Sequence, residues 1–308
     1  MRFLKFLAGV AAVMMSFCEP ATANQANRAW DARSVPRPQL ATSGGITPKG
    51  PDGSWRLMFD DGFDGSSIDQ SKWQFRSSAE ADWSGTPFGT GNSGNQQLEF
   101  DQPGNCSVAG GALTITAKPD DITSQSGQHY NWSSCLITST GQNGYAFRYG
   151  YIEIKAQLPS ARGFWPAFWT WQAAGNRQYT ETDVFEFFSD NHTRLYLSQH
   201  SGPDDGCVYT PPFDPTAGMH VYGADIHEHG TDFYVDGRPV CHVRGTSTGM
   251  TNVIVDNFVY SEIPPAPHSV GRMSVDYVRA WDRVDKTVDS KVFSWGHWSK
   301  VARDHAMS

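Results

Sequence analysis

Apolar and polar residues alternate along most of this chain, in short stretches separated by glycine, asparagine, aspartate and proline. In the range 152–158, isoleucine, alanine and leucine alternate with glutamate, lysine and glutamine. A period of two is typical of a strand with one face in the core and one in water. Gly110-Gly111 and Asp236-Gly237 precede or join such stretches, as hairpin turns do. Helical periodicity is nearly absent, so the pattern predicts an all-β protein, a sandwich or barrel of antiparallel strands.

The ends of the chain lack this alternation and divide it into four parts. Residues 1–23 have basic residues, then an apolar stretch, then small residues, which predicts a secretory signal peptide. Residues 24–53 are rich in proline, alanine, serine and glycine and are expected to form a linker or N-terminal arm. The alternating part, 54–284, is the main domain, and 285–308 form a C-terminal extension. We therefore expect a secreted protein, extracellular or periplasmic.

The net charge and the aromatic content limit which classes of molecule this protein can bind. The formal charge of −8 disfavours nucleic acid, whose recognition needs clustered lysine and arginine. Beyond the signal, no segment is long and apolar enough to span a bilayer, so we expect no membrane partner, and we expect a monomer. The 11 tryptophans, 11 tyrosines and 18 phenylalanines suit flat apolar platforms for sugar rings as well as a core.

Four cysteines remain after the signal peptide: Cys106, Cys135, Cys207 and Cys241. An even number in an exported protein predicts two disulfides, and three pairings are open. The pairs Cys106–Cys135 and Cys207–Cys241 are favoured, because sequence neighbours usually meet in antiparallel sheets. A metal site built from these cysteines is disfavoured, since no Cys-x-x-Cys spacing occurs.

The segment ETDVFE holds three carboxylates, Glu181, Asp183 and Glu186. Glu181 and Asp183 share a strand face, whereas Glu186 falls on the opposite face of a regular strand. A β-bulge at Val184-Phe185 would return Glu186 to the first face. Like charges on one face repel, but a retaining glycosidase needs two carboxyl groups about 5–5.5 Å apart. Alone, the motif fits a solvated acidic surface or a Ca²⁺ site as well.

If the bulge is present, the three carboxylates take different roles. Glu181 is then the nucleophile, ionised and hydrogen-bonded to Asp183. Glu186 is the acid/base, kept protonated by its negative neighbours and partial burial. Asp183 tunes Glu181 and shares a proton with it, so the three titrate as a coupled set.

The segments YGYIEIKAQLP, RGFWPAFWTW and ETDVFE, in this order, resemble glycoside hydrolase family 16. The segments LMFDDGFDGSSIDQSKW, NQQLEF, MHVYGADIHEHGTDFYVDG and MSVDYVRAW extend the resemblance over 54–282. It implies a β-jelly-roll sandwich of two antiparallel sheets, one of them concave with an open substrate cleft, and a catalytic domain at 54–284. The E-x-D-x-x-E form resembles the laminarinase side of the family.

The resemblance also assigns site residues. It matches Glu181 with the nucleophile, Asp183 with the assisting acid and Glu186 with the acid/base. The positions it matches with substrate contacts are Trp165, Trp169, His200 and Asn95, and Asp276 lies where some members hold a structural calcium ion. Core packing is the alternative for the tryptophans and an ordinary sheet aspartate for Asp276, whereas Phe164, Phe168 and Trp171 are expected in the core. No cofactor is required.

These observations predict a secreted, endo-acting, retaining glycoside hydrolase whose partner is a polysaccharide. β-1,3-Glucan ranks first as substrate and mixed-linkage β-glucan second. Gln97 stands where β-1,3-glucanases often have glutamate, and the loop 261–267 departs from the family pattern. A galactan or a bacterial exopolysaccharide is therefore the alternative substrate class. A transglycosylase and a non-catalytic carbohydrate-binding jelly roll are the alternative functions.

Overall fold

The computed structural model describes residues 45–76, 96–124, 127–173, 180–201, 205–245 and 249–284. The predicted signal peptide, most of the predicted arm, Asn95 and the C-terminal extension lie outside these ranges. All the described elements are strands except one 3-10 turn, η4 (Pro103–Asn105). Within the described residues, no helix has the length and apolar character needed to cross a bilayer.

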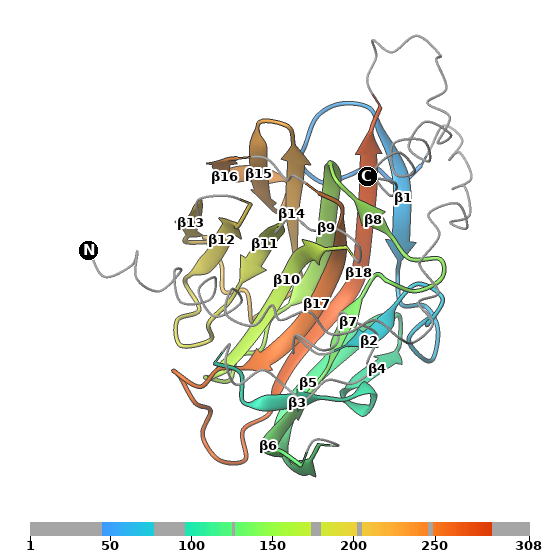
Figure 1. The fold of residues 1–308 in the computed structure, drawn as a ribbon. Helices are drawn as coiled ribbons and strands as arrows, with labels where there is room; N and C mark the ends of the chain where they lie inside the picture. Colours follow the sequence, from blue (N-terminus) through green and yellow to red (C-terminus); the bar gives the residue numbers. More distant parts are fainter. Residues whose placement is uncertain are drawn as a thin grey trace, which may run out of the picture.

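The strands form two sheets that lie face to face (Figure 1). In order, the first sheet contains β16 (Arg238–Arg244), β15 (Gly230–Val235), β14 (His220–His227), β9 (Gly150–Gln157), β18 (Gly271–Arg283), β5 (Ala112–Thr123), β6 (His129–Ser134) and β3 (Glu99–Asp101), while β1 (Trp55–Asp61) pairs with β18 and β4 (Cys106–Ala109) with β5. The second contains β13 (Asp205–Tyr209), β12 (Leu195–Gln199), β11 (Glu181–Glu186), β10 (Phe164–Gln172), β17 (Thr251–Val259), β7 (Leu136–Thr138) and β2 (Gln74–Arg76), with β8 (Ala146–Phe147) on β17.

The pairing is antiparallel throughout these strands except between β3 and β6, which run parallel. Alternate residues of facing strands fill the space between the sheets. Ile152 and Ile154 of β9 belong to the same buried cluster as Phe168 of β10 and Val255 of β17. The all-β fold predicted from the alternation is confirmed, and of the two alternatives, sandwich and barrel, it is the sandwich. Each sheet buries one face against the other, which removes apolar area from water.

The alternation predicted that the other face of β9 is wet, and this holds only in part, since Lys155 and Gln157 are partly exposed but Glu153 is buried. Glu153 is fully buried because residues 45–53 pack across the first sheet. The Lys49 amide donates to Oε2 of Glu153 at 2.7 Å, and the Tyr151 hydroxyl donates to the Lys49 carbonyl. The Trp281 indole donates to the Ile46 carbonyl at 3.0 Å. The described end of the predicted arm is thus attached to the domain.

Both favoured disulfides, Cys106–Cys135 and Cys207–Cys241, are confirmed. The reason given for the second pair was wrong, since its strands are not neighbours in one sheet. Cys207 lies on β13 and Cys241 on β16, which are the terminal strands of the two opposing sheets. This bond therefore closes one edge of the sandwich.

Candidate active site

A β-bulge in β11 determines which way the carboxylates point. β11 is antiparallel to β10, with Phe168 opposite Phe185 and Trp169 opposite Asp183, which leaves Val184 as an extra residue without a partner. Val184 and Phe185 are consecutive, yet both pack into the core between the sheets. A regular strand cannot place two consecutive side chains on one face. The bulge predicted from the sequence is therefore present.

The bulge gathers the three acidic residues on one face of the second sheet. The cross-strand pairs are Glu181 with Trp171, Asp183 with Trp169 and Glu186 with Ala167. These three β10 partners belong to a hydrophobic cluster separate from the core between the sheets. Because directly paired residues share a face, all three carboxylates lie on the face turned away from the first sheet. We call this the site face.

Asp183 is held by the neighbouring strand. Its Oδ2 accepts a hydrogen bond from the Ser198 hydroxyl at 3.1 Å and lies 3.0 Å from Nε2 of His200. The His200 amide donates to the Glu181 carbonyl at 3.0 Å. The side chains of Asp183, Ser198, His200 and Glu181 are all buried. His200, predicted from the sequence, is thus brought to the carboxylates, whereas Ser198 was not foreseen.

Glu186 is in the environment that a general acid requires. Burial, and then the negative charge of Asp183, raise the pKa of Glu186 well above its ordinary value. Glu181 raises this pKa further, while His200 and the hydrogen bond from Trp165 oppose the rise. The Trp165 indole donates to Oε1 of Glu186 at 3.1 Å. Glu186 therefore holds its proton at a higher pH than an ordinary glutamate does.

Two further buried carboxyl groups lie beside the site face and were missed by sequence reasoning. Trp169 donates its indole N–H to Oδ2 of Asp256, on β17, at 2.5 Å. Burial is the largest cause that raises the pKa of Asp256, and Glu99, Glu186 and Asp183 add to it. Burial also raises the pKa of Glu99 to about 7. The signal for Asp256 was available, because a carboxylate interrupts the otherwise apolar run VIVDNFVY.

The aromatic side chains of the site face are packed together. Trp165 contacts Phe188, Phe258 and Tyr260, with ring centroids 5.0 to 5.4 Å apart. Trp169 lies edge-on to Trp171 at 5.9 Å. Trp171 is buried, as expected, but it lies in this cluster on the site face together with Trp169 and not between the sheets.

The predicted sugar contacts of these tryptophans remain predictions. Trp165 and Trp169 are only 4% and 6% exposed. In the structure, the Trp165 indole N–H donates a hydrogen bond to Glu186 and the Trp169 indole N–H donates one to Asp256.

The remaining predicted positions lie apart from this group. Asn95 falls outside the described residues. Asp276 is on β18 of the first sheet, where its Oδ2 lies 2.7 Å from Nζ of Lys155. The lysine ammonium already neutralises this carboxylate and lies where a cation would bind, so these two side chains do not fit a calcium site. The calcium expectation at Asp276 stays untested, and no step is derived from it.

Comparison with known proteins gives one consistent family. A family model described as glycosyl hydrolases family 16 matches residues 75–277. The endo-1,3-1,4-β-glycanase EglC of Rhizobium meliloti is 29% identical over 187 residues, which cover 57% of this chain and 39% of that protein. Glucan endo-1,3-β-glucosidase A1 of Niallia circulans is 26% identical over 290 residues, which cover 80% of this chain and 41% of that protein. The chain thus spans about two fifths of these relatives.

Solved structures share the jelly-roll fold. The endo-β-1,3-glucanase from Pyrococcus furiosus superposes with a TM-score of 0.67 at 25% identity, covering 78% of this chain and 100% of that one. The catalytic domain of a laminarinase from Thermotoga petrophila gives a TM-score of 0.66 at 24% identity, covering 76% and 100%. The predicted fold class, a β-jelly-roll sandwich, is confirmed.

Proposed function

Because the chain belongs to glycosyl hydrolases family 16, we propose that it is an endo-acting glycoside hydrolase that cleaves β-1,3- or mixed-linkage β-glucan with retention of anomeric configuration. The observation that carries the proposal is the bulge at Val184, which brings Glu181, Asp183 and Glu186 to one face of the sheet. The raised pKa of Glu186 separates its role from that of the other two carboxylates. One protonated and one ionised carboxyl group are what a double displacement requires.

In the first step, Glu186 donates its proton to the glycosidic oxygen while the bond from that oxygen to the anomeric carbon breaks. An oxygen of the Glu181 carboxylate attacks the anomeric carbon from the opposite side and forms a glycosyl ester. The leaving chain departs with the proton from Glu186. The Trp165 indole, which donates to Oε1 of Glu186, favours the carboxylate that this transfer produces.

In the second step, the Glu186 carboxylate removes a proton from water as the water oxygen attacks the anomeric carbon. The ester bond to Glu181 breaks, and Glu181 leaves as a carboxylate. One water molecule is consumed, and both residues return to their starting protonation states. Ser198 and His200 hold the Asp183 carboxylate in place among the three acidic residues. Its negative charge therefore stays next to Glu186 between turnovers.

β-Glucan is preferred as substrate for two reasons. The relatives and solved structures that match this chain include an endo-1,3-1,4-β-glycanase, a glucan endo-1,3-β-glucosidase and an endo-β-1,3-glucanase. The formal charge of −8 also disfavours strongly anionic polymers.

The apolar pattern of residues 1–23 and the two disulfides support export of the enzyme to an oxidising compartment. We propose that it acts as a secreted monomer.

The test is release of reducing ends from a panel of polysaccharides: β-1,3-glucan, mixed-linkage β-glucan, agarose and carrageenan. Wild type should cleave the glucans internally, and Glu181→Ala should lose this activity and the turnover of an activated aryl β-glucoside. Added azide should restore aryl glucoside turnover in Glu181→Ala with inversion, because it takes the place of the missing carboxylate. Wild-type turnover in Glu181→Ala would refute the nucleophile assignment. Binding of glucan without cleavage would identify a carbohydrate-binding protein, and products longer than the substrate a transglycosylase.

A further inference from the structure

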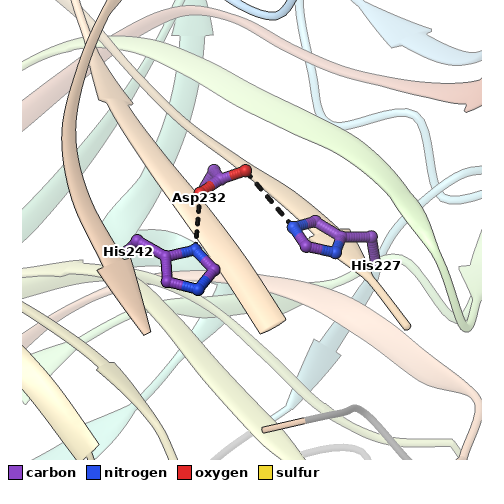
Figure 2. A group of neighbouring side chains, drawn as sticks. All are labelled: His227, Asp232 and His242. Carbon is purple, nitrogen blue, oxygen red and sulfur yellow. Dashed lines mark hydrogen bonds and ion pairs between the residues drawn. The ribbon is translucent and has the colours of Figure 1, made fainter. Parts of the chain in front are cut away.

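A second group of potential ligands lies on the first sheet, away from the site face. His227, Asp232 and His242 come from three adjacent strands, β14, β15 and β16 (Figure 2). The residues that alternate with them, Ile226, Phe233 and others, point into the core. The three side chains therefore share the outer face of the first sheet, whereas the catalytic carboxylates lie on the second sheet.

The three side chains converge on Asp232. Its Oδ2 lies 3.2 Å from Nε2 of His227, and its Oδ1 lies 2.7 Å from Nδ1 of His242. One ligand atom from each residue falls within 4.8 Å of the others. The two imidazole rings are nearly parallel, at 22°, with centroids 6.2 Å apart. Figure 2 shows both rings turned toward the carboxylate between them.

The backbone favours this convergence. Asp232 and His242 are direct partners in the β15–β16 ladder, so their side chains emerge side by side. Gly230 lies opposite Arg244 in the same ladder, and a Cβ on Gly230 would overlap the Val243 carbonyl oxygen and come within 3.1 Å of the His242 ring. The missing side chain at Gly230 therefore leaves room for the ring of His242.

Two imidazole nitrogens and a carboxylate oxygen form a ligand set for a transition-metal ion rather than for Ca²⁺ or Mg²⁺, which prefer oxygen. Zinc binds such atoms at about 2.0–2.2 Å in a tetrahedron, which puts ligand atoms about 3.4 Å from one another. The two nitrogen–oxygen distances, 3.2 and 2.7 Å, run to different oxygens of Asp232, and one ligand atom from each residue already lies within 4.8 Å of the others. Rotation of these partly exposed side chains would bring both ring nitrogens and one oxygen to the tetrahedral spacing.

We propose that His227, Asp232 and His242 form a zinc site on the outer face of the first sheet, with a fourth position open to solvent. The ion replaces the protons that now join the two rings to Asp232, and so links β14, β15 and β16. Its role is to hold these strands together, because the group has no contact with the glycosidase carboxylates. Neither the matched family nor the named relatives supply this assignment.

Binding has one local cost. Nδ1 of His227 accepts a hydrogen bond from the His229 amide at 3.2 Å. A neutral imidazole that binds metal through Nε2 carries its proton on Nδ1, so this bond must be released. The amide lies in the exposed turn after β14 and can donate to water instead. We therefore expect zinc to bind reversibly, so that a chelator removes it from the folded protein.

The test uses the full chain without a histidine tag, treated with EDTA and then dialysed. Titration calorimetry with ZnCl₂ should show one saturable site per chain. Asp232→Asn and His242→Gln should each weaken zinc binding at least about tenfold, because each removes a ligand. Zinc at about a hundredfold excess over its Kd should raise the Tm of wild type by about 5 °C.

The matched control is His220→Gln on the same strand as His227. His220 pairs with Asp236 at 2.7 Å but belongs to no group of three ligands among the described residues. This variant should keep wild-type zinc affinity. Electron paramagnetic resonance of wild type with one equivalent of Cu²⁺ should show two coupled nitrogens, and this readout needs no variant to fold. Absence of a saturable site, unchanged affinity in Asp232→Asn, or coupling to fewer than two nitrogens would show a metal-free hydrogen-bonded group and overturn the proposal.

Discussion

Glu99 should make the stability of this protein fall as the pH rises. Its side chain is fully buried on β3, and Oε2 accepts the Val259 amide at 2.7 Å. Burial raises its pKa from 4.5 to about 7. Below pH 4.5 the carboxyl group is protonated in the folded and unfolded states alike, so it imposes no penalty. Between about pH 4.5 and 7 the unfolded chain releases the proton and the folded chain retains it, so stability falls as the pH rises.

The size of this effect follows from the two pKa values. Their separation corresponds to about 3 kcal/mol of unfolding free energy, lost completely once the pH exceeds about 7. Glu99→Gln keeps an oxygen that can accept the Val259 amide but cannot ionise. The stability of the variant relative to wild type should therefore rise by about 3 kcal/mol between pH 4 and pH 8. Any constant cost of the new amide cancels in this difference.

The assay is urea unfolding at several pH values, followed by tryptophan fluorescence with the disulfides intact. Glu228→Gln is the matched control, because it removes a carboxyl group from an exposed turn, where the side chain is 72% exposed. Its curve should parallel that of wild type. If the difference between Glu99→Gln and wild type stays constant from pH 4 to pH 8, the buried, proton-retaining state of Glu99 is refuted.

Three further predictions concern the acid/base and the edge of the sandwich. The raised pKa of Glu186 predicts that the loss of kcat/KM on β-glucan on the alkaline side, where Glu186 gives up its proton, comes at a higher pH than the ordinary pKa of a glutamate would give. Glu186→Ala should lose about 10²–10⁴-fold in kcat on β-glucan but far less in ester formation from an activated aryl glycoside, whose leaving group needs no proton; equal losses would refute the role. Replacing Cys207 and Cys241 with serine should lower the free energy of unfolding by about 4 kcal/mol, given the separation of 34 residues, with folded-state activity unchanged. Urea unfolding would measure this loss, and a loss below about 1 kcal/mol would contradict it.

Local pattern was sufficient for the strands and the bulge, whereas the Cys207–Cys241 pair joins two different sheets, which local pattern did not indicate. The period of two marks strands directly, and Glu181, Asp183 and Glu186 share a face only if one extra residue intervenes. Long-range burial was harder to predict. Alternation shows which residues of β9 share a face, but not that a segment 100 residues earlier covers Glu153. It likewise places Trp171 with Trp169, so the expected burial of Trp171 is found in the cluster on the site face.

The buried acids beside the site face escaped prediction for a related reason. Glu99 and Asp256 lie on β3 and β17, more than 150 residues apart in sequence, and neither belongs to a local acidic motif. Their effect on each other depends on strand order in the folded sandwich. A carboxylate in an apolar run signals burial, but not which partner it meets.

The segment 45–53 also affects where the chain can be shortened. The alternation of apolar and polar residues begins at Ser54, so the sequence alone suggests this residue as the start of a shortened protein for expression. A protein that begins there would lose the Lys49 amide and carbonyl, which bind Glu153 and Tyr151. Glu153 would then keep the hydrogen bond from Tyr277 at 3.0 Å, but its other oxygen would need a new donor. Shortened versions intended for structural work should therefore start at or before Gly45.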